Sequence, residues 1–240
     1  SSGKDGIAIC GYHGWHDWYL ASNLDNNNNL SEHLLPGLEA SGVPKNLKGT
    51  VHPFQYNNFK QLKEIVETRN IGVIKMEVQR NFKPENSFLQ KVRELATKFN
   101  IVLIFDECTS GFRETFGGLH LKYDVNPDIA IFGKALGNGY AITSVIGKRD
   151  IMEAAQSTFI SSTFWTERIG FSAALKTLEV MERLNSWEYI TSVGNDVIEN
   201  WNKIANNNSL KIDISGLPCM SSFKFNEKNL ELKTFITQEM

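Results

Sequence analysis

Short apolar runs rich in valine and isoleucine recur between residue 6 and residue 147. They cover residues 6–10, 71–78, 101–107, 128–132 and 143–147. Three of them carry almost no polar residue, which is typical of strands that are buried on both faces of a parallel sheet. The pattern therefore predicts a mostly parallel β-sheet.

Helical periodicity separates these runs, most clearly over residues 87–100. There the apolar positions recur at spacings of three and four residues, at Phe88, Val92, Leu95 and Phe99. Asn86 or Ser87 is expected to cap the first turn, because its side-chain oxygen can accept from a free backbone N–H group. The alternation of strands and helices predicts an α/β fold with right-handed crossovers.

The last third of the chain has a different pattern. Two long amphipathic helical patterns fill residues 171–206 without a strand between them. We therefore expect a sheet domain over residues 1–170, a helical connection over residues 171–206, and the start of a smaller α/β domain over residues 207–240. Asparagine-rich patches at residues 23–30 and 206–209 predict exposed loops, because asparagine favours turns.

The charge balance argues against two classes of partner. The 240 residues include 25 basic and 27 acidic side chains, which give a formal net charge of −2. Such a balance gives no reason to expect nucleic acid or an anionic membrane as a partner. Hydrophobic residues make up 41% of the chain, which is enough to build one large core.

Cysteine usage predicts a reducing, cytoplasmic environment. Cys10, Cys108 and Cys219 are widely separated, so they match neither a disulfide framework nor a zinc pattern. No run reaches the roughly 18 apolar residues of a membrane helix, and the first ten residues lack the pattern of a signal peptide. The absence of an initiator methionine predicts that the sequence begins inside a longer protein.

Two of the predicted strands end in carboxylates. Asp106 and Glu107 end the run over residues 101–107, and Glu77 comes near the end of the run over residues 71–78. Ligands of an open parallel sheet bind beyond the carboxyl ends of its strands, so Asp106 is where a functional acid is expected. An acid that caps the next turn is the alternative, as is a Mg²⁺ site formed by Asp106 and Glu77.

An aromatic segment, GYHGWHDWYL, follows the first predicted strand. Tyr12 and His13 lie between two glycines at the strand end, where glycine permits close approach and an aromatic ring can cover a planar ligand. Trp15 and Trp18 are instead expected in the core, because tryptophan in such a segment is on average highly buried.

Lys134 lies in the run IAIFGKALGNGY, among apolar and small residues. Burying an ammonium is costly unless it is paired or uncharged, so this lysine needs a partner or a chemical role. A surface lysine on a glycine turn is the alternative. In a phosphate-binding loop the lysine follows the glycines, whereas Lys134 precedes them, which argues against such a loop.

Together these segments resemble the class III, fold type I, pyridoxal 5'-phosphate (PLP)-dependent aminotransferases, especially the glutamate-1-semialdehyde 2,1-aminomutase group and its relatives in surface-sugar pathways. The resemblance extends from GYHGWHDWYL through KMEVQ, LIFDECTSGFR, FGKALGNGY and SSTFWTERIGF to GLPCMSSFKF. It implies a three-layer α/β/α large domain followed by the start of a small C-terminal domain. Val78 stands where the family usually has proline, and the family's N-terminal phosphate cup and substrate gate would precede Ser1.

The resemblance implies roles for four residues around the cofactor. Lys134 matches the Schiff-base lysine and is therefore the expected catalytic residue. Asp106 matches the carboxylate that pairs with the pyridine nitrogen. Tyr12 matches the aromatic residue that stacks on the cofactor ring, with His13 beside it.

Three further positions match the family pattern. Thr109 occupies the position that faces the cofactor's phenolic oxygen. Thr163 matches the threonine that reaches the phosphate of the cofactor bound by the neighbouring subunit, which implies a homodimer with shared active sites. Glu77 matches the acid of the family's usual Glu-Pro pair, and no metal is implied.

The resemblance implies PLP-dependent transamination of a small amino or carbonyl substrate, with pyridoxamine 5'-phosphate in the alternate half-reaction. The reaction is either the intramolecular exchange of an aminomutase or the transfer of an amino-sugar aminotransferase. Burial among apolar residues would keep the Lys134 amine unprotonated, and Asp106 would keep the pyridine nitrogen protonated. The alternatives are a non-catalytic interaction module and a Mg²⁺-dependent phosphotransferase.

Overall fold

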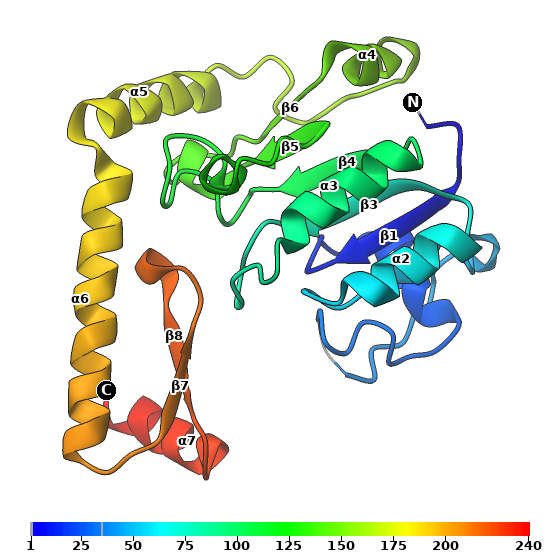
Figure 1. The fold of residues 1–240 in the computed structure, drawn as a ribbon. Helices are drawn as coiled ribbons and strands as arrows, with labels where there is room; N and C mark the ends of the chain where they lie inside the picture. Colours follow the sequence, from blue (N-terminus) through cyan, green and yellow to red (C-terminus); the bar gives the residue numbers. More distant parts are fainter. Residues whose placement is uncertain (1, 35) are drawn as a thin grey trace.

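The computed structural model describes residues 2–34 and 36–240, and a six-stranded sheet forms its larger part (Figure 1). The strands are β1 (Gly6–Cys10), β2 (Val51–Pro53), β3 (Ile71–Glu77), β4 (Val102–Asp106), β5 (Ile129–Phe132) and β6 (Ser144–Gly147). Their order is β2-β1-β3-β4-β5-β6, and all neighbours are parallel except β5 and β6. The predicted α/β fold with a mostly parallel sheet is confirmed.

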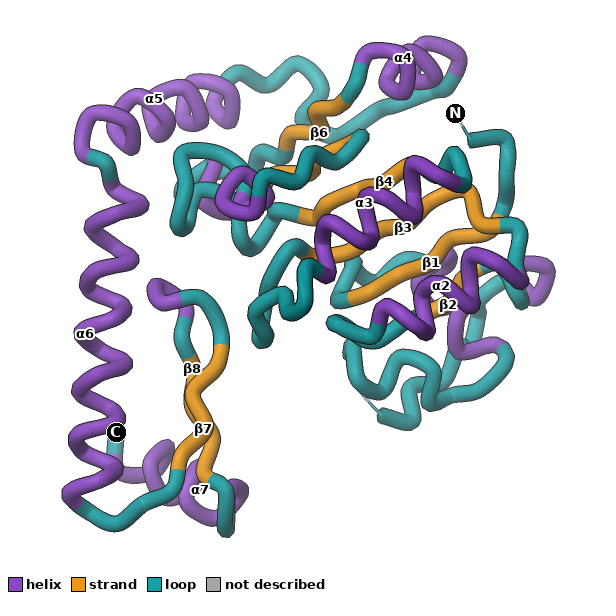
Figure 2. Tube along the Cα trace, viewed as in Figure 1, coloured by secondary structure: helices purple, strands orange, loops and turns teal. Residues whose placement is uncertain are grey.

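Two helices, α2 (Phe59–Thr68) and α3 (Phe88–Lys98), cover one face of the sheet (Figure 2). They bury the apolar side chains that their periodicity groups on one side, including Leu62, Val66, Leu89, Val92 and Leu95, against Ile74, Met76, Leu103 and Phe105 of the sheet. The expected cap of α3 is wrong, because Ser87 adopts a left-handed backbone and its side chain makes no cap hydrogen bond. In α2, by contrast, Asn58 accepts from the Gln61 backbone N–H.

The other face of the sheet is covered by the short helix α1 (Asp17–Leu20) and by turns up to β2. A second apolar cluster forms there around Ile9 and Tyr19. The expected burial of Trp15 is wrong, because its side chain is 59% exposed. The asparagine-rich patch is exposed at residues 25–28, as expected, but Asn23 is buried, because its side chain bonds the backbone of Leu38 and Leu30 in place of water.

The C-terminal elements leave the sheet through α4 (Arg149–Met152), α5 (Ile169–Leu184) and α6 (Ser186–Asn207) and end in a small unit (Figure 1). That unit contains the antiparallel strands β7 (Ile212–Ser215) and β8 (Ser222–Phe225), followed by α7 (Asn229–Glu239). Helix α5 packs against the apolar side chains of β5, and α6 turns away from it. The division into domains at residues 170 and 206 stays a prediction.

No helix among the described residues is long and apolar enough to cross a membrane.

Candidate active site

The carboxyl ends of β3 and β4 bring the two predicted strand-end acids together. Glu77 and Asp106 are partners in the parallel register of these strands. Both side chains are nearly buried, at 10% and 12% exposure respectively. The edge of the sheet where α/β folds bind ligands therefore carries two neighbouring carboxyl groups.

Asp106 is held by three donors. His13 Nδ1 lies 3.1 Å and Lys75 Nζ 3.4 Å from Oδ2, and the Cys108 backbone N–H donates to Oδ1 over 3.2 Å. Burial raises the pKa of a carboxyl group, but the hydrogen bond from His13 and the charge of Lys75 outweigh it and lower the pKa of Asp106 to about 2. Asp106 is therefore a fixed anion at neutral pH.

His13 is placed behind Asp106. Its ring is buried, and Nε2 lies 3.1 Å from the Cys10 backbone oxygen. Burial lowers the pKa of His13, while the hydrogen bond to Asp106 opposes that shift. Both ring nitrogens already face protein acceptors, so His13 is arranged to orient Asp106.

Glu77 differs from its neighbour. Burial raises the pKa of Glu77, and the Arg80 guanidinium, whose Nη1 is 3.7 Å from Oε2, only partly offsets this. Gly11, with φ of +104°, is required beside it, because a Cβ there would lie 2.5 Å from Glu77 Oε2. The end of β1 therefore packs directly on the Glu77 carboxyl group.

Lys134 follows β5 and has a left-handed backbone with φ of +46°, which is unusual for a residue other than glycine. Its amine donates to Thr109 Oγ1 over 2.6 Å, so two of the predicted site residues meet. The predicted burial of Lys134 is wrong, because the residue is exposed. The described residues around it do not supply the desolvation that the apolar sequence implied.

Glu107, next to Asp106, has a structural role. It is fully buried and accepts hydrogen bonds from the Ser110 hydroxyl, the His120 backbone N–H and His120 Nδ1. These bonds fix the loop that carries Cys108 and Thr109. Turn capping, which the sequence left open for Asp106, is present at both acids: Asp106 Oδ1 accepts from the Cys108 backbone N–H, and Glu107 is wholly occupied by such loop contacts.

Two cavities open at this edge of the sheet. One, of about 680 Å³, is lined by Tyr12, Trp15, Glu77, Arg80 and Phe82 among others. The second, of about 720 Å³, is lined by residues that include Lys134, Thr143, Ser162, Phe164 and Trp165. Tyr12 and Lys134 thus face different cavities.

Thr163 stands apart from the other predicted site residues. It is exposed in the loop that leads into α5. Within the described part of the chain, no hydrogen bond joins it to Lys134, Thr109 or Asp106. Over residues 2–34 and 36–240, no group of three or more His, Cys, Asp or Glu side chains is arranged to hold a metal.

Lys75 is the site residue that sequence reasoning missed. It touches Asp106 and lies 5.4 Å from the centre of the Trp18 ring. The signal was present, since Lys75 is the one charged residue before Glu77 in the apolar run over residues 71–78. A lysine in a strand that reads as buried on both faces needs a partner.

Comparison with known proteins gives a consistent family. The model of the family "Aminotransferase class-III" matches residues 20–239. A 3-aminobutyryl-CoA aminotransferase of Cloacimonas acidaminovorans is 34% identical, over 97% of this chain and 55% of its own length. A glutamate-1-semialdehyde 2,1-aminomutase of Sulfolobus acidocaldarius is 33% identical, over 78% of this chain and 45% of its own length. The chain spans about half the length of these relatives.

Solved structures agree on the fold. An omega-transaminase from Sphaerobacter thermophilus superposes with a TM-score of 0.81 at 20% identity, covering 95% of this chain and 55% of that protein. The FumI protein of Sphingopyxis sp. MTA144, in its PLP internal aldimine form, gives a TM-score of 0.81 at 19% identity, with 95% and 53% covered.

Proposed function

The chain belongs to the class-III aminotransferases, a PLP-dependent family, and from that membership we propose that it carries out transamination at the sheet edge around Lys134 and Asp106. The observation that carries the proposal is that a fixed carboxylate and an exposed amine lie at the ends of adjacent strands. Asp106 ends β4 and Lys134 follows β5, next to it in the sheet.

The residues present fit PLP. The ring nitrogen of PLP needs an anion, which the low pKa of Asp106 provides at any physiological pH. Its aldehyde needs an accessible amine, and Lys134 is exposed with a neutral hydroxyl, Thr109, as its hydrogen-bond partner. Tyr12 offers an aromatic face, although it lines the neighbouring cavity and not the one that Lys134 lines. We assign Tyr12, Asp106, Thr109 and Lys134 to the cofactor, with His13 orienting Asp106.

When bound, PLP supplies an electron sink that stabilises the charge left when a bond at the substrate Cα breaks. Asp106 holds a proton on the ring nitrogen, and His13 and Lys75 keep the carboxylate in place. Lys134 Nζ would hold the cofactor and, when not bonded to it, would be the base that moves a proton at the substrate Cα, a role that typically accelerates a reaction by about 10²–10⁴-fold.

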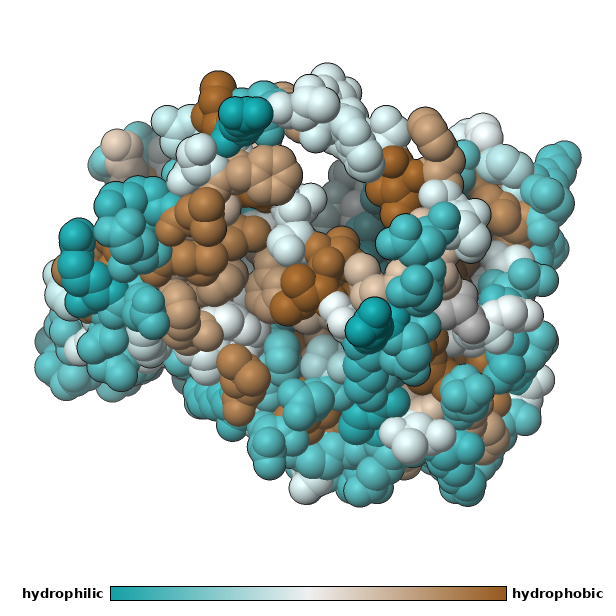
Figure 3. Space-filling view, turned by 90° about the horizontal axis from the view of Figure 1, so that it is seen from above, coloured by the Kyte–Doolittle hydropathy of each residue, from teal (hydrophilic) through white to brown (hydrophobic). Residues whose placement is uncertain are grey.

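We further propose that the active unit is a homodimer in which Thr163 binds the phosphate at the partner's site. The loop around Thr163 exposes large apolar side chains, and Phe159 is 94% exposed. Phe164 and Trp165 are exposed on the same loop, and further large apolar side chains are exposed on β6 and α5, namely Val145, Ile146, Ile169, Phe171 and Leu175. Figure 3 shows hydrophobic residues gathered on the face seen from above. An exposed apolar patch of this kind supports the proposed subunit interface.

The substrate and the reaction type are also proposed. The relatives act on different substrates, one by name on an aminoacyl-CoA and the other on glutamate 1-semialdehyde. The cavity beside Tyr12 carries Arg80, 49% exposed, whose guanidinium is only loosely paired with Glu77. We propose a small amino or carbonyl substrate with an acidic group that Arg80 binds. Its amino group is either moved within the same molecule, as in an aminomutase, or transferred to a second substrate, such as a keto sugar.

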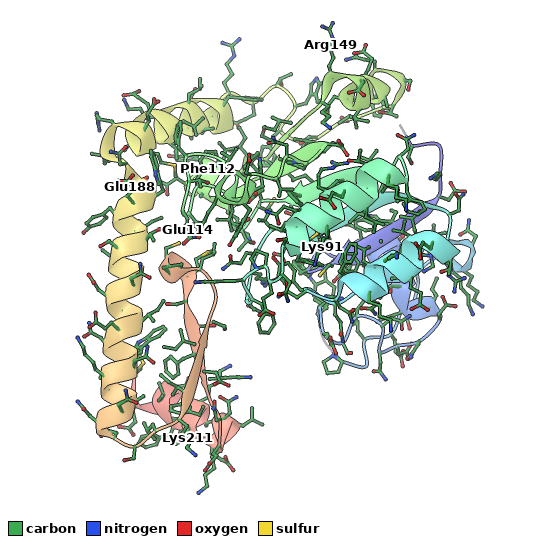
Figure 4. All side chains as sticks on the ribbon, viewed as in Figure 1. Lys91, Phe112, Glu114, Arg149, Glu188 and Lys211 are labelled. Carbon is green, nitrogen blue, oxygen red and sulfur yellow. The ribbon has the colours of Figure 1, made fainter. Side chains whose placement is uncertain are left out.

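The test is to attach PLP covalently to the lysine that binds it and to identify that lysine. The purified protein is incubated with PLP, reduced with borohydride and digested, and the peptide that retains PLP is identified by mass spectrometry. We expect it to contain Lys134, and we expect Lys134→Ala to lose both the label and transamination with amino donors. Lys91→Ala, an exposed lysine on α3 (Figure 4), is the matched control and should retain both. Labelling that survives in Lys134→Ala would overturn the proposal.

A further inference from the structure

Lys75 lies in the middle of β3, in a row of the sheet that is otherwise apolar. Its register partners are Ile9 on β1 and Ile104 on β4. Only 16% of its side chain is exposed. Burying an ammonium in such surroundings costs free energy unless a charge or an aromatic face compensates it. The contacts of Lys75 should therefore show what stabilises its charge.

Those contacts are a carboxylate and an aromatic ring. Lys75 Nζ lies 3.4 Å from Asp106 Oδ2 and 5.4 Å from the centre of the Trp18 ring. A cation over an indole face is attracted by the ring quadrupole, so Trp18 gives the ammonium a second favourable contact besides the carboxylate. Trp18 is itself partly buried against the apolar cluster around Ile9 and Tyr19, so the ring cannot move freely.

Lys75 and His13 share a single oxygen of Asp106. Both approach Oδ2, at 3.4 Å and 3.1 Å, while Oδ1 accepts only the Cys108 backbone N–H among the described residues. A carboxylate contacted at one oxygen by Lys75 from β3 and by His13 from the turn after β1 has little freedom to rotate. Its other oxygen keeps acceptor capacity, because each carboxylate oxygen can accept more than one hydrogen bond.

We propose that Lys75 is a positioning residue for Asp106: held between the Trp18 ring and Oδ2, it fixes the carboxylate so that Oδ1 is presented to the ring nitrogen of the cofactor. This proposal rests on the proposed function for the identity of the ligand. Its structural part, the grip of Lys75 on Asp106, does not depend on PLP.

The electrostatic consequence follows from the groups around the carboxylate. His13 and Lys75 favour the anion, Glu77 disfavours it, and Lys134 and Cys108 lie on the adjoining loops. Lys75 is the sole permanent cation in contact with Asp106 among the described residues. Removing its charge therefore raises the pKa of Asp106 and frees the carboxylate to rotate.

The experiment compares wild type with Lys75→Met and Lys75→Arg. The aspartate carboxyl carbons are labelled with ¹³C, Asp106 is assigned through Asp106→Asn, and the PLP-free protein is titrated by NMR. We expect the pKa of Asp106 to rise by about one pH unit in Lys75→Met, and PLP to dissociate about ten-fold more readily. Lys75→Arg, which keeps the charge, should restore most of both.

A matched control is Lys148→Met. Lys148 pairs with Asp128, another buried aspartate, over 2.7 Å at the far end of β5. Its loss removes a lysine–aspartate pair elsewhere in the fold, with a more exposed lysine, and should leave the Asp106 titration and PLP affinity as in wild type. An unchanged titration in Lys75→Met overturns the proposal, and so does a shifted titration with unchanged PLP affinity. Failure of the wild type to bind PLP would instead contradict the proposed function alone.

A converse measurement covers the case in which Lys75→Met does not fold. Reductive methylation rates of the Lys75 amine are compared in wild type and in Asp106→Asn. Because the ammonium is held against the carboxylate, we expect Lys75 to react several-fold faster in the variant. Equal rates would show that Asp106 does not hold Lys75.

Discussion

Glu77 and Asp106 lie opposite each other at the ends of β3 and β4, and yet their pKa values move in opposite directions. Burial raises the pKa of Glu77, whereas His13 and Lys75 hold the pKa of Asp106 at about 2 despite burial. The difference lies in the partners, since the cation nearest Glu77 is a half-exposed arginine. One strand pair therefore carries one permanent anion and one carboxyl group that accepts a proton more easily.

The loss of unfolding free energy at low pH should depend on Asp106. Its pKa is about 3.8 when unfolded and about 2 when folded, so its contribution is complete above pH 4 and is lost as the pH falls toward 2. The expected loss is about 2 kcal/mol of unfolding free energy, measured by urea denaturation across this range. In Asp106→Asn this part of the pH dependence should be absent. An identical acid slope in the variant would contradict the assignment.

Shared active sites predict complementation between two inactive variants. We expect Thr163→Ala and Lys134→Ala each to lose most activity, because each active site would need Lys134 from its own subunit and Thr163 from the other. Unfolded together in equal amounts and refolded, they should regain about one quarter of wild-type activity, since half of the dimers are mixed and each has one intact site.

The control for that experiment is Thr166→Ala, an exposed threonine on the same loop, which should be active alone. No recovery in the mixture, with both variants dimeric by sedimentation, would mean that Thr163 does not serve the partner's site.

Arg80→Ala should separate substrate binding from chemistry. Arg80 lies in the cavity beside Tyr12 and does not contact Asp106 or Lys134, so its loss removes an anion partner for the substrate. We expect KM to rise about ten-fold or more with a smaller change in kcat. Arg149→Ala on α4 (Figure 4), an exposed arginine far from this cavity, should leave both unchanged. A fall in kcat alone would contradict the role given to Arg80.

Close packing of α6 predicts a stability effect at Gly194. A Cβ there would meet the Pro218 carbonyl group and lie 2.7 Å from the Cys219 backbone nitrogen. Backbone atoms yield little, so Gly194→Ala should destabilise the C-terminal unit by about 1–3 kcal/mol. Ser192→Ala, exposed on the same helix, should be nearly neutral. Thermal unfolding of both variants measures the difference, and equal melting would show that α6 and residues 218–219 do not pack closely.

The strands β1, β3, β4, β5 and β6 all lie within the predicted ranges. Buried parallel strands need continuous apolar runs, which explains the first four, whereas β6 is antiparallel and exposes Val145 and Ile146, so its apolar run has a different cause. Strand β2 was missed. It has three residues, ends in Pro53 and lies at the sheet edge, where neither length nor alternation gives a signal. The expectation for Trp15 was wrong because a composition rule describes average burial, whereas this particular side chain is 59% exposed.

The sequence by itself determined the family, the α/β sheet and the strand-end positions of Asp106 and Lys134, because these depend on local patterns and motif spacing. Only the tertiary structure decided the surroundings of each charge. Lys134, which the apolar sequence placed in the interior, is exposed beside Thr109, whereas Lys75 is the lysine enclosed by the fold. Burial and pairing are properties of neighbours brought together from β1, β3 and β4, and a linear pattern does not contain them.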